Sequence, residues 1–181
     1  MQGGYYGNAL QAASLGGHEA IVQLLLEHKV DVNVQGGEYG NALQAALSGS
    51  HEAIVQLLLE HKADVNMQGG RYGNALQAAS LGGHETIVQL LLEHKADVNM
   101  QGGEYDNAPQ ATSLKGHEAI VQLLLEHKAD INVQGGEYGN ALQAASLRGH
   151  EAIVQPLLEH TTDVNMQGGF YDNALQAASS K

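Results

Sequence analysis

Residues 36–68, GGEYGNALQAALSGSHEAIVQLLLEHKADVNMQ, form a unit that nearly the whole chain repeats. One asparagine in each copy marks the period: Asn8, Asn41, Asn74, Asn107, Asn140 and Asn173 lie 33 residues apart. Self-similarity at this period is typical of a solenoid, in which each unit buries its apolar face only against its neighbours. The sequence therefore predicts one extended stack with a long surface for holding a partner. A single deep catalytic cleft is not expected.

The first half of the unit predicts a turn followed by a short helix. Residues 36–40 have turn composition. Asn41 stands where a helix N-cap is needed, because its side-chain oxygen can accept a backbone N–H of the first turn. Residues 42–47 then form the helix, whose alanines let a neighbouring helix approach closely, and residues 48–50 end it.

The second half predicts a longer, one-sided helix that begins at His51 or Glu52. Apolar residues at helical spacing form its buried stripe, which consists of Ala53, Ile54, Val55, Leu57 and Leu58. Its outward face consists of Glu52, Gln56 and Glu60. Residues 63–66 form an extended return to the next turn. Two such short helices are marginal alone, so packing between repeats has to stabilise them.

Three sequence features together resemble the ankyrin repeat. They are a Gly-His pair before the second helix (Gly17-His18), Ile-Val-x-Leu-Leu-Leu within it (residues 21–26), and Ala-Asp-Val-Asn after it (residues 63–66). The family's Thr-Pro-Leu-His is replaced here by Asn-Ala-Leu-Gln, as at residues 41–44. In this variant the Asn can cap the helix as Thr does, and the Gln amide can bridge adjacent loops as His does. The Gly-Gly-x-Tyr-Gly-Asn-Ala-Leu-Gln-Ala-Ala pattern is similar to near-identical ankyrin arrays of filamentous fungi.

The resemblance implies an all-α ankyrin-repeat solenoid of stacked helix-turn-helix units joined by hairpin-like loops. It spans residues 1–181 as a single domain, with five 33-residue repeats in 1–165 and a C-terminal half repeat in 166–181. It also implies that the loop tips and the exposed side of the first helices form a concave face that binds protein partners.

Composition excludes several classes of function. The sequence has no cysteine and no apolar stretch near the ~20 residues of a membrane span, so neither a disulfide framework nor membrane insertion is expected. The N-terminus does not have the composition of a signal peptide. Eight basic and twenty acidic residues give a net charge of −12, which argues against nucleic-acid binding and weakly favours a basic partner. An intracellular, cytoplasmic protein is predicted.

The repeated polar residues do not predict an enzyme, a cofactor or a metal site. The histidines form two rows, and equivalent members lie one helix-packing distance apart, roughly 10 Å, which is too far for shared coordination. The first row is expected to cap and bridge helices and the second to be exposed; the rows are His18, His51, His84, His117 and His150, and His28, His61, His94, His127 and His160. The repeated carboxylates, Glu27 to Glu159, occupy five equivalent environments, whereas acid–base catalysis needs two different ones.

Positions at which the copies differ are the candidate partner-binding residues. Three such rows map onto the expected concave side: the residue before the repeated tyrosine, the residue after it, and the end of the first helix. Arg and Tyr are common interface anchors. The predicted binding residues are Glu38, Tyr39, Arg71, Tyr72, Glu104, Tyr105, Asp106, Lys115, Glu137, Tyr138 and Arg148.

Two alternatives stay open at this point. The variation can be unconstrained change at exposed loop tips, and the tyrosines can be a ladder of rings that pack on one another. Because neither terminus has a polar capping repeat, the sequence also fits a piece of a longer array or a self-associating stack that joins end to end into oligomers or fibres.

Two prolines are expected to cost stability. Pro156 replaces a leucine inside the second helix of the fifth repeat, where a lost hydrogen bond costs roughly 3 kcal/mol, so this repeat is predicted to be kinked and to fray first. Pro109 replaces the leucine of a first helix. Its position near the helix start is sterically tolerable, but the lost burial costs about 2–3 kcal/mol.

Overall fold

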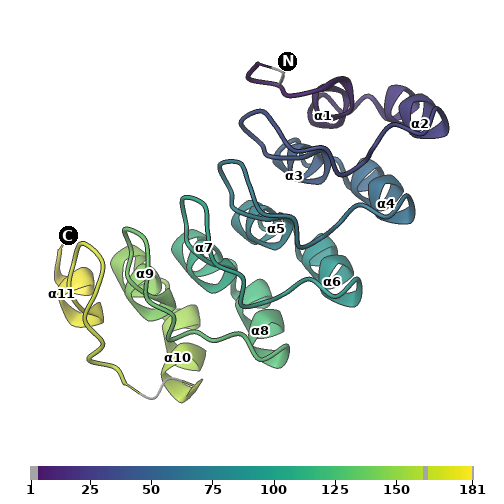
Figure 1. Ribbon diagram of the computed structural model, residues 1–181. Coiled ribbons are helices and arrows are strands. Elements are labelled where there is room, and N and C mark those ends of the chain that lie inside the picture. Colours follow the sequence, from purple (N-terminus) through teal and green to yellow (C-terminus); the bar gives the residue numbers. More distant parts are fainter. Residues whose placement is uncertain (1–3, 161–162, 181) are drawn as a thin grey trace.

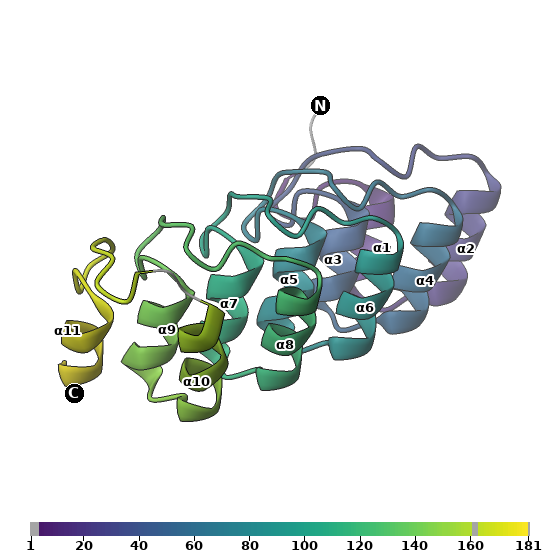
Figure 2. The same ribbon diagram turned by 90° about the horizontal axis from the view of Figure 1, so that it is seen from below.

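The structure, a computed structural model, describes residues 4–160 and 163–180, so the turn residues expected at 1–3 lie outside it. Pairs of antiparallel helices stack into an arc (Figure 1). The first helices and the hairpin loops lie on the inner side of the arc, and the second helices lie on the outer side. Figure 2 shows the two rows of helices side by side along the stack.

The described residues contain eleven α-helices, which alternate between the two rows. The inner row consists of α1 (Ala9–Leu15), α3 (Ala42–Ser48), α5 (Ala75–Gly82), α7 (Ala108–Lys115), α9 (Ala141–Arg148) and α11 (Ala174–Ser179). The outer row consists of α2 (Glu19–Glu27), α4 (Glu52–Glu60), α6 (Glu85–Glu93), α8 (Glu118–Glu126) and α10 (Glu151–His160). Isolated antiparallel bridges close the loops between them at Gly36–Gly40, Gly69–Gly73 and Gly135–Gly139. The predicted all-α solenoid with hairpin-like loops is confirmed.

Asparagine N-caps fix where the inner helices begin. In α3 the Asn41 side-chain oxygen accepts the backbone N–H of Gln44 at 2.9 Å, and the equivalent bond is present in the other five inner helices. This bond satisfies one of the N–H groups that a helix start leaves without a partner. The predicted cap, the predicted limits of the first helix and the predicted start of the second agree with the structure to within one residue, and the second helix ends at Glu60.

Burial differs between the two rows. Every residue from Ala42 to Leu47 is buried, because α3 lies between α1 and α5. In α4 the buried residues are Ile54, Val55, Leu58 and Leu59, whereas Leu57 is half-buried. The prediction for Ala53 is wrong: it is exposed, because it lies in the first turn on the outer side of the stack. The predicted extended return also contains a turn, in which the Asp64 carboxylate accepts the N–H of Asn66 at 2.9 Å.

The core is divided, although the repeats predict a continuous one. One buried cluster extends from Leu10 to Leu124, and a second extends from Val121 to Leu157. They meet in the fourth repeat, where Pro109 and Thr112 occupy positions that are leucine and alanine in the neighbouring copies. Pro109 lacks the branched end of the leucine that it replaces, and Thr112 places a hydroxyl where the neighbouring copies have only the methyl group of alanine.

Both prolines lie inside helices. Pro109 is the second residue of α7, in agreement with the expected, sterically tolerable position near the helix start. Its side chain is buried. Pro156 lies in the middle of α10, and the helix continues through it to His160. Pro156 therefore does not end the helix; the kink and the fraying remain predictions.

Candidate protein-binding face

A buried glutamine in each inner helix supports the hairpin of the next repeat. The Gln77 side chain is 1% exposed, and its amide group donates hydrogen bonds to the carbonyls of Met100 (3.0 Å) and Asp106 (2.9 Å). Gln11, Gln44, Gln110 and Gln143 bond the following hairpins in the same way. The bridging role predicted for this glutamine is confirmed. The candidate face is therefore supported from beneath by buried glutamine side chains.

Gln77→Ala is expected to destabilise the protein by about 2 kcal/mol, because it removes the side-chain donor of the Met100 carbonyl and one of the two donors of the Asp106 carbonyl, which also accepts the N–H of Gly102. Gln89→Ala is the matched control, since Gln89 is exposed and bonds only Glu93, at 3.0 Å. Its cost should stay below about 0.5 kcal/mol. Urea unfolding followed by circular dichroism measures both variants. Equal unfolding midpoints for the two would show that the buried amide contributes nothing.

A backbone ladder joins the hairpin tips. The N–H of Arg71 donates to the carbonyl of Glu38 at 2.8 Å, and the N–H of Glu104 donates to the carbonyl of Arg71 at 3.0 Å. The same bond joins the first pair of hairpins and the last pair. Among the described residues the ladder is interrupted once, between Glu104 and Glu137. At this junction the Asp106 side chain faces Gly135, whereas a glycine stands at its position in the second, third and fifth hairpins.

Arg71 lies between two carboxylates of the neighbouring hairpins. Its Nε donates to a Glu104 oxygen at 3.1 Å, and one terminal nitrogen lies 3.8 Å from a Glu38 oxygen. The hydrogen bond to Glu104 raises the pKa of Arg71, and its guanidinium carbon lies 5.6 Å from the centre of the Tyr72 ring. Three predicted binding residues therefore already hold one another. Such exposed ion pairs each contribute about 0–1 kcal/mol, so a partner can replace them at small cost.

The repeated tyrosines from Tyr39 to Tyr171 are half-buried, Tyr6 is exposed, and some of the rings pack on one another. The Tyr39 and Tyr72 rings stack with their centres 6.4 Å apart, and Tyr5 meets Tyr39 edge-on at 6.2 Å. Burial raises the pKa of Tyr105. Within the tyrosine row of the described residues, the ring ladder proposed from the sequence is present only between the second and third repeats, because Tyr5 belongs to the position before the row. These half-buried rings therefore pack within the hairpin layer and remain partly accessible to solvent.

The other predicted binding residues lie along the same face. Lys115 and Arg148 are exposed at the last residues of α7 and α9, and Glu137 is exposed on the fifth hairpin. Tyr138 and Asp106 are half-buried beside them. All eleven predicted residues therefore belong to the hairpins or to the inner-helix ends on the inner side of the arc.

The first histidine row bridges repeats, although the predicted capping is wrong. These side chains make no capping bond to their own helices. His51 Nε2 instead lies 3.0 Å from the carbonyl oxygen of Leu15 in the preceding inner helix, and His117 and His150 repeat this contact. An inner helix leaves its last carbonyls without partners, and the next repeat supplies the donor.

The second histidine row is exposed, as predicted, and also has a local partner. In each repeat its Nδ1 lies 2.8–2.9 Å from the carbonyl oxygen four residues earlier, as His28 does with Leu24. In the described part of the chain, no group of three or more His, Cys, Asp and Glu side chains is placed to hold a metal ion. None of the helices within residues 4–160 and 163–180 has the length and apolar character of a membrane span.

A cavity of about 290 Å³ opens on this face across the second to fourth repeats. Its lining includes four predicted residues, Arg71, Tyr72, Tyr105 and Lys115. It also includes Ser48, Ser50 and His84, which sequence analysis did not select. The signal for the serines was available: the other copies have leucine and glycine at their positions.

Comparison with known proteins agrees with this architecture. The family model described as ankyrin repeats (3 copies) matches residues 10–102 and 76–168. The chain is similar in structure to the crystal structure of the human ASB11 ankyrin repeat domain, with a TM-score of 0.80 and 25% sequence identity. This similarity covers 96% of the chain and 78% of the ASB11 chain. No curated protein sequence matches the chain.

Proposed function

Because the chain belongs to the ankyrin-repeat family, we propose that it is a non-enzymatic protein–protein interaction module. Ankyrin repeats generally bind protein partners, and the inner face of this arc is the surface that we assign to binding. One observation carries the proposal. The non-periodic charges Arg71, Lys115 and Arg148 all lie on this face, whereas the periodic lysines Lys29, Lys62, Lys95 and Lys128 follow the outer helices.

The contact residues that we propose differ in role. Lys115, Glu137 and Arg148 are exposed and can meet a partner directly. Glu38, Arg71 and Glu104 form ion pairs across the hairpins, so a partner would exchange one charged contact for another. The tyrosines of the row add rigid rings beside these charges, and such rings are common interface anchors.

Arg71→Ala/Arg148→Ala is expected to reduce recovery of the partner about tenfold in a pull-down from a cell extract, because two interface arginines together contribute more than about 1.4 kcal/mol. Lys95→Ala/Lys128→Ala removes the same charge from the outer side and should leave recovery unchanged. Quantitative mass spectrometry of the bound proteins measures both. Equal recovery with the two double variants would reject the inner face as the binding surface.

A second function, end-to-end self-association, has a separate observation in its favour. The two terminal repeats expose large apolar side chains: Tyr5, Tyr6, Ile21 and Leu24 at one end, and Phe170 and Leu175 at the other. A contact between unlike ends does not close on itself, so it would give oligomers or fibres. Light scattering over a range of concentrations tests this. A constant monomer mass at high concentration would remove it.

We place this function inside the cell, in the cytoplasm. The absence of cysteine from the sequence supports this, since extracellular domains of this size commonly rely on disulfides. A fungal origin is part of the same proposal and rests on the repeated Gly-Gly-x-Tyr-Gly-Asn-Ala-Leu-Gln-Ala-Ala pattern.

A further inference from the structure

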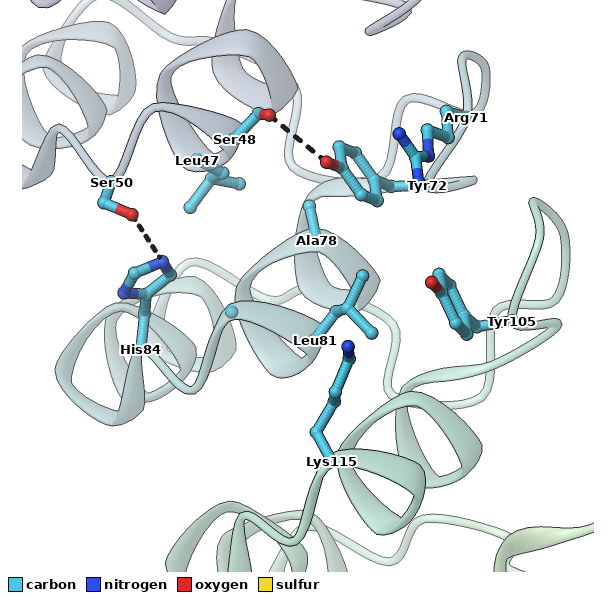
Figure 3. A pocket seen from close by; sticks show the side chains of 11 residues that line it. Leu47, Ser48, Ser50, Arg71, Tyr72, Ala78, Leu81, His84, Tyr105 and Lys115 are labelled. Carbon is cyan, nitrogen blue, oxygen red and sulfur yellow. Dashed lines mark hydrogen bonds between the residues drawn. The ribbon is translucent and has the colours of Figure 1, made fainter. Parts of the chain in front are cut away.

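The cavity on the inner face has an apolar floor and a polar rim (Figure 3). Leu47, Ala78 and Leu81 contribute the apolar side chains. The rim carries hydroxyl, imidazole and cationic groups from three repeats: Ser48, Ser50, Tyr72, His84, Tyr105, Arg71 and Lys115. The lining contains no carboxylate, although acidic residues outnumber basic ones twenty to eight in the sequence.

Departures from the repeat pattern converge on this cavity. In the second repeat, Leu47 and Ser48 stand in the reverse order of Ser80 and Leu81, and Ser50 replaces the glycine of the other copies. At the position before the repeated tyrosine, the third repeat has Arg71, whereas the second, fourth and fifth repeats have glutamate. The fourth repeat has Lys115 where the first three have glycine. Five lining residues therefore differ from their equivalents in the other copies, so the packing that the repeats share does not require them. They are Leu47, Ser48, Ser50, Arg71 and Lys115.

The substituted serines orient their neighbours on the rim. The hydroxyls of Ser48 and Tyr72 lie 3.2 Å apart, and the Ser50 hydroxyl lies 3.2 Å from His84 Nε2 (Figure 3). His84 thus bonds a side chain, whereas His51, His117 and His150 bond a backbone carbonyl of the preceding inner helix. Ser50 holds this position with a φ of 59°, in the left-handed region that the equivalent glycines occupy without strain.

The charges of the cavity favour one anionic group. Lys115 is exposed and forms no ion pair within 4 Å among the described residues, and its side chain extends toward Leu81 (Figure 3). Arg71 keeps donors beyond those that Glu38 and Glu104 engage. The carboxylates of Glu38 and Glu104, together with the net charge of −12, would repel a polyanion. A single carboxylate meets less repulsion and can still pair with the cations of the cavity.

We propose that this cavity binds a glutamate or aspartate side chain of a protein partner, with an adjacent apolar side chain on the floor. The carboxylate pairs with Lys115 and accepts hydrogen bonds from the rim hydroxyls of Ser48, Tyr72 and Tyr105. The apolar neighbour covers Leu81 and Ala78. This assignment rests on the proposed function, because it names the chemistry that the inner face recognises.

Three matched peptides test the assignment: acetyl-Gly-Leu-Glu-Leu-Gly-amide and its glutamine and phosphoserine counterparts. Each is titrated into the isotope-labelled full chain while amide resonances are followed by NMR. The glutamate peptide should shift the resonances of Tyr72, Leu81, His84 and Lys115. It should bind about fivefold more tightly than the glutamine peptide, as a partly exposed charge pair allows. This preference should weaken as salt concentration rises.

Two variants locate the site. Lys115→Gln should abolish the preference for glutamate, whereas Lys128→Gln, which removes a lysine from the outer side of the same repeat, should leave it intact. Leu47→Ser/Ser48→Leu/Ser50→Gly restores residues that the other copies already carry, so it should fold and should also lose the preference. Circular dichroism checks the folding of each variant.

Several results would overturn the assignment. They are equal affinities of the glutamate and glutamine peptides, shifts confined to residues outside the cavity, and phosphoserine binding more than about tenfold tighter than glutamate. Failure here is separable from failure of the proposed function. If the Arg71→Ala/Arg148→Ala variant loses its partner but the glutamate peptide does not bind, only the cavity assignment falls. If the peptide binds the cavity but Arg71→Ala/Arg148→Ala leaves partner recovery unchanged, the inner face is rejected as the partner-binding surface, whereas the carboxylate chemistry of the cavity stands.

Discussion

Gly70→Ala is expected to destabilise the protein by about 3–4 kcal/mol. Gly70 has a φ of 64°, where an alanine costs roughly 1–2 kcal/mol in strain. A Cβ atom would also lie 2.3 Å from the carbonyl carbon of Tyr39 and 2.5 Å from the nitrogen of Gly40. Because both neighbours are backbone atoms of the preceding hairpin, the two loops have to separate, which adds about 1–3 kcal/mol. Urea unfolding and hydrogen exchange of the second and third hairpins measure the loss.

Gly136→Ala is the matched control, because Gly136 is the same position two repeats later. Its φ is 58°, but the nearest atom to an added Cβ is the Asp106 Cβ, at 3.4 Å. Only the backbone strain remains, so the expected cost is about 1–2 kcal/mol. If both alanines cost the same, the close approach of the hairpins at Gly70 does not contribute to stability.

The difference between these two glycines reflects the interruption in the hairpin ladder. At the junction between the fourth and fifth repeats, the bond between Glu137 and Glu104 is missing, and the Asp106 side chain faces the next hairpin. No arginine stands between Glu104 and Glu137 in the hairpin series, whereas Arg71 lies between Glu38 and Glu104. The core divides at the same repeat. The hairpin ladder and the core clusters therefore both change at this repeat, although α7 and α9 still pack closely on each other.

Most of the fold could be predicted from the sequence, because each local sequence pattern occurs five or six times along the chain. The asparagine caps, the helical apolar stripe and the bridging glutamine each predicted a contact that the structure contains. The failures arose where burial depends on a neighbouring repeat. Ala53 fits the stripe by spacing but lies outside the packed surface. The histidines before the outer helices bridge helices as predicted, but His51 bonds a carbonyl of the preceding repeat and does not cap its own helix.

Only part of the candidate site could be predicted from the sequence, because its residues come together only when the repeats stack. Differences between copies identified Arg71 and Lys115, but these residues lie 44 positions apart in the sequence (115 − 71), and only stacking brings them to one cavity. The ion pairs of Arg71 were equally hidden, since its partners are 33 residues away on each side. Ser48 and Ser50 resembled ordinary helix-ending residues until the structure placed them against Tyr72 and His84.

Pro156→Leu is expected to stabilise the fifth repeat by about 3 kcal/mol. Proline has no N–H, so the carbonyl of Ala152 has no helical donor in α10, and the ring crowds the preceding turn. Leucine is the residue at this position in the other four outer helices, where it is partly buried in three of them and packs against the core. The substitution therefore restores a hydrogen bond, helix propensity and apolar contact together.

Hydrogen exchange tests whether α10 opens more easily than the other outer helices or is as stable as they are. In the natural sequence the amides of residues 151–160 should exchange faster than those of residues 118–126, because a helix without one internal bond opens at lower free energy. In the Pro156→Leu variant the two helices should become alike, while exchange in α2 stays unchanged. Equal protection of α8 and α10 before the substitution would contradict the predicted fraying, since it would mean that packing against α8 and α9 offsets the missing bond completely.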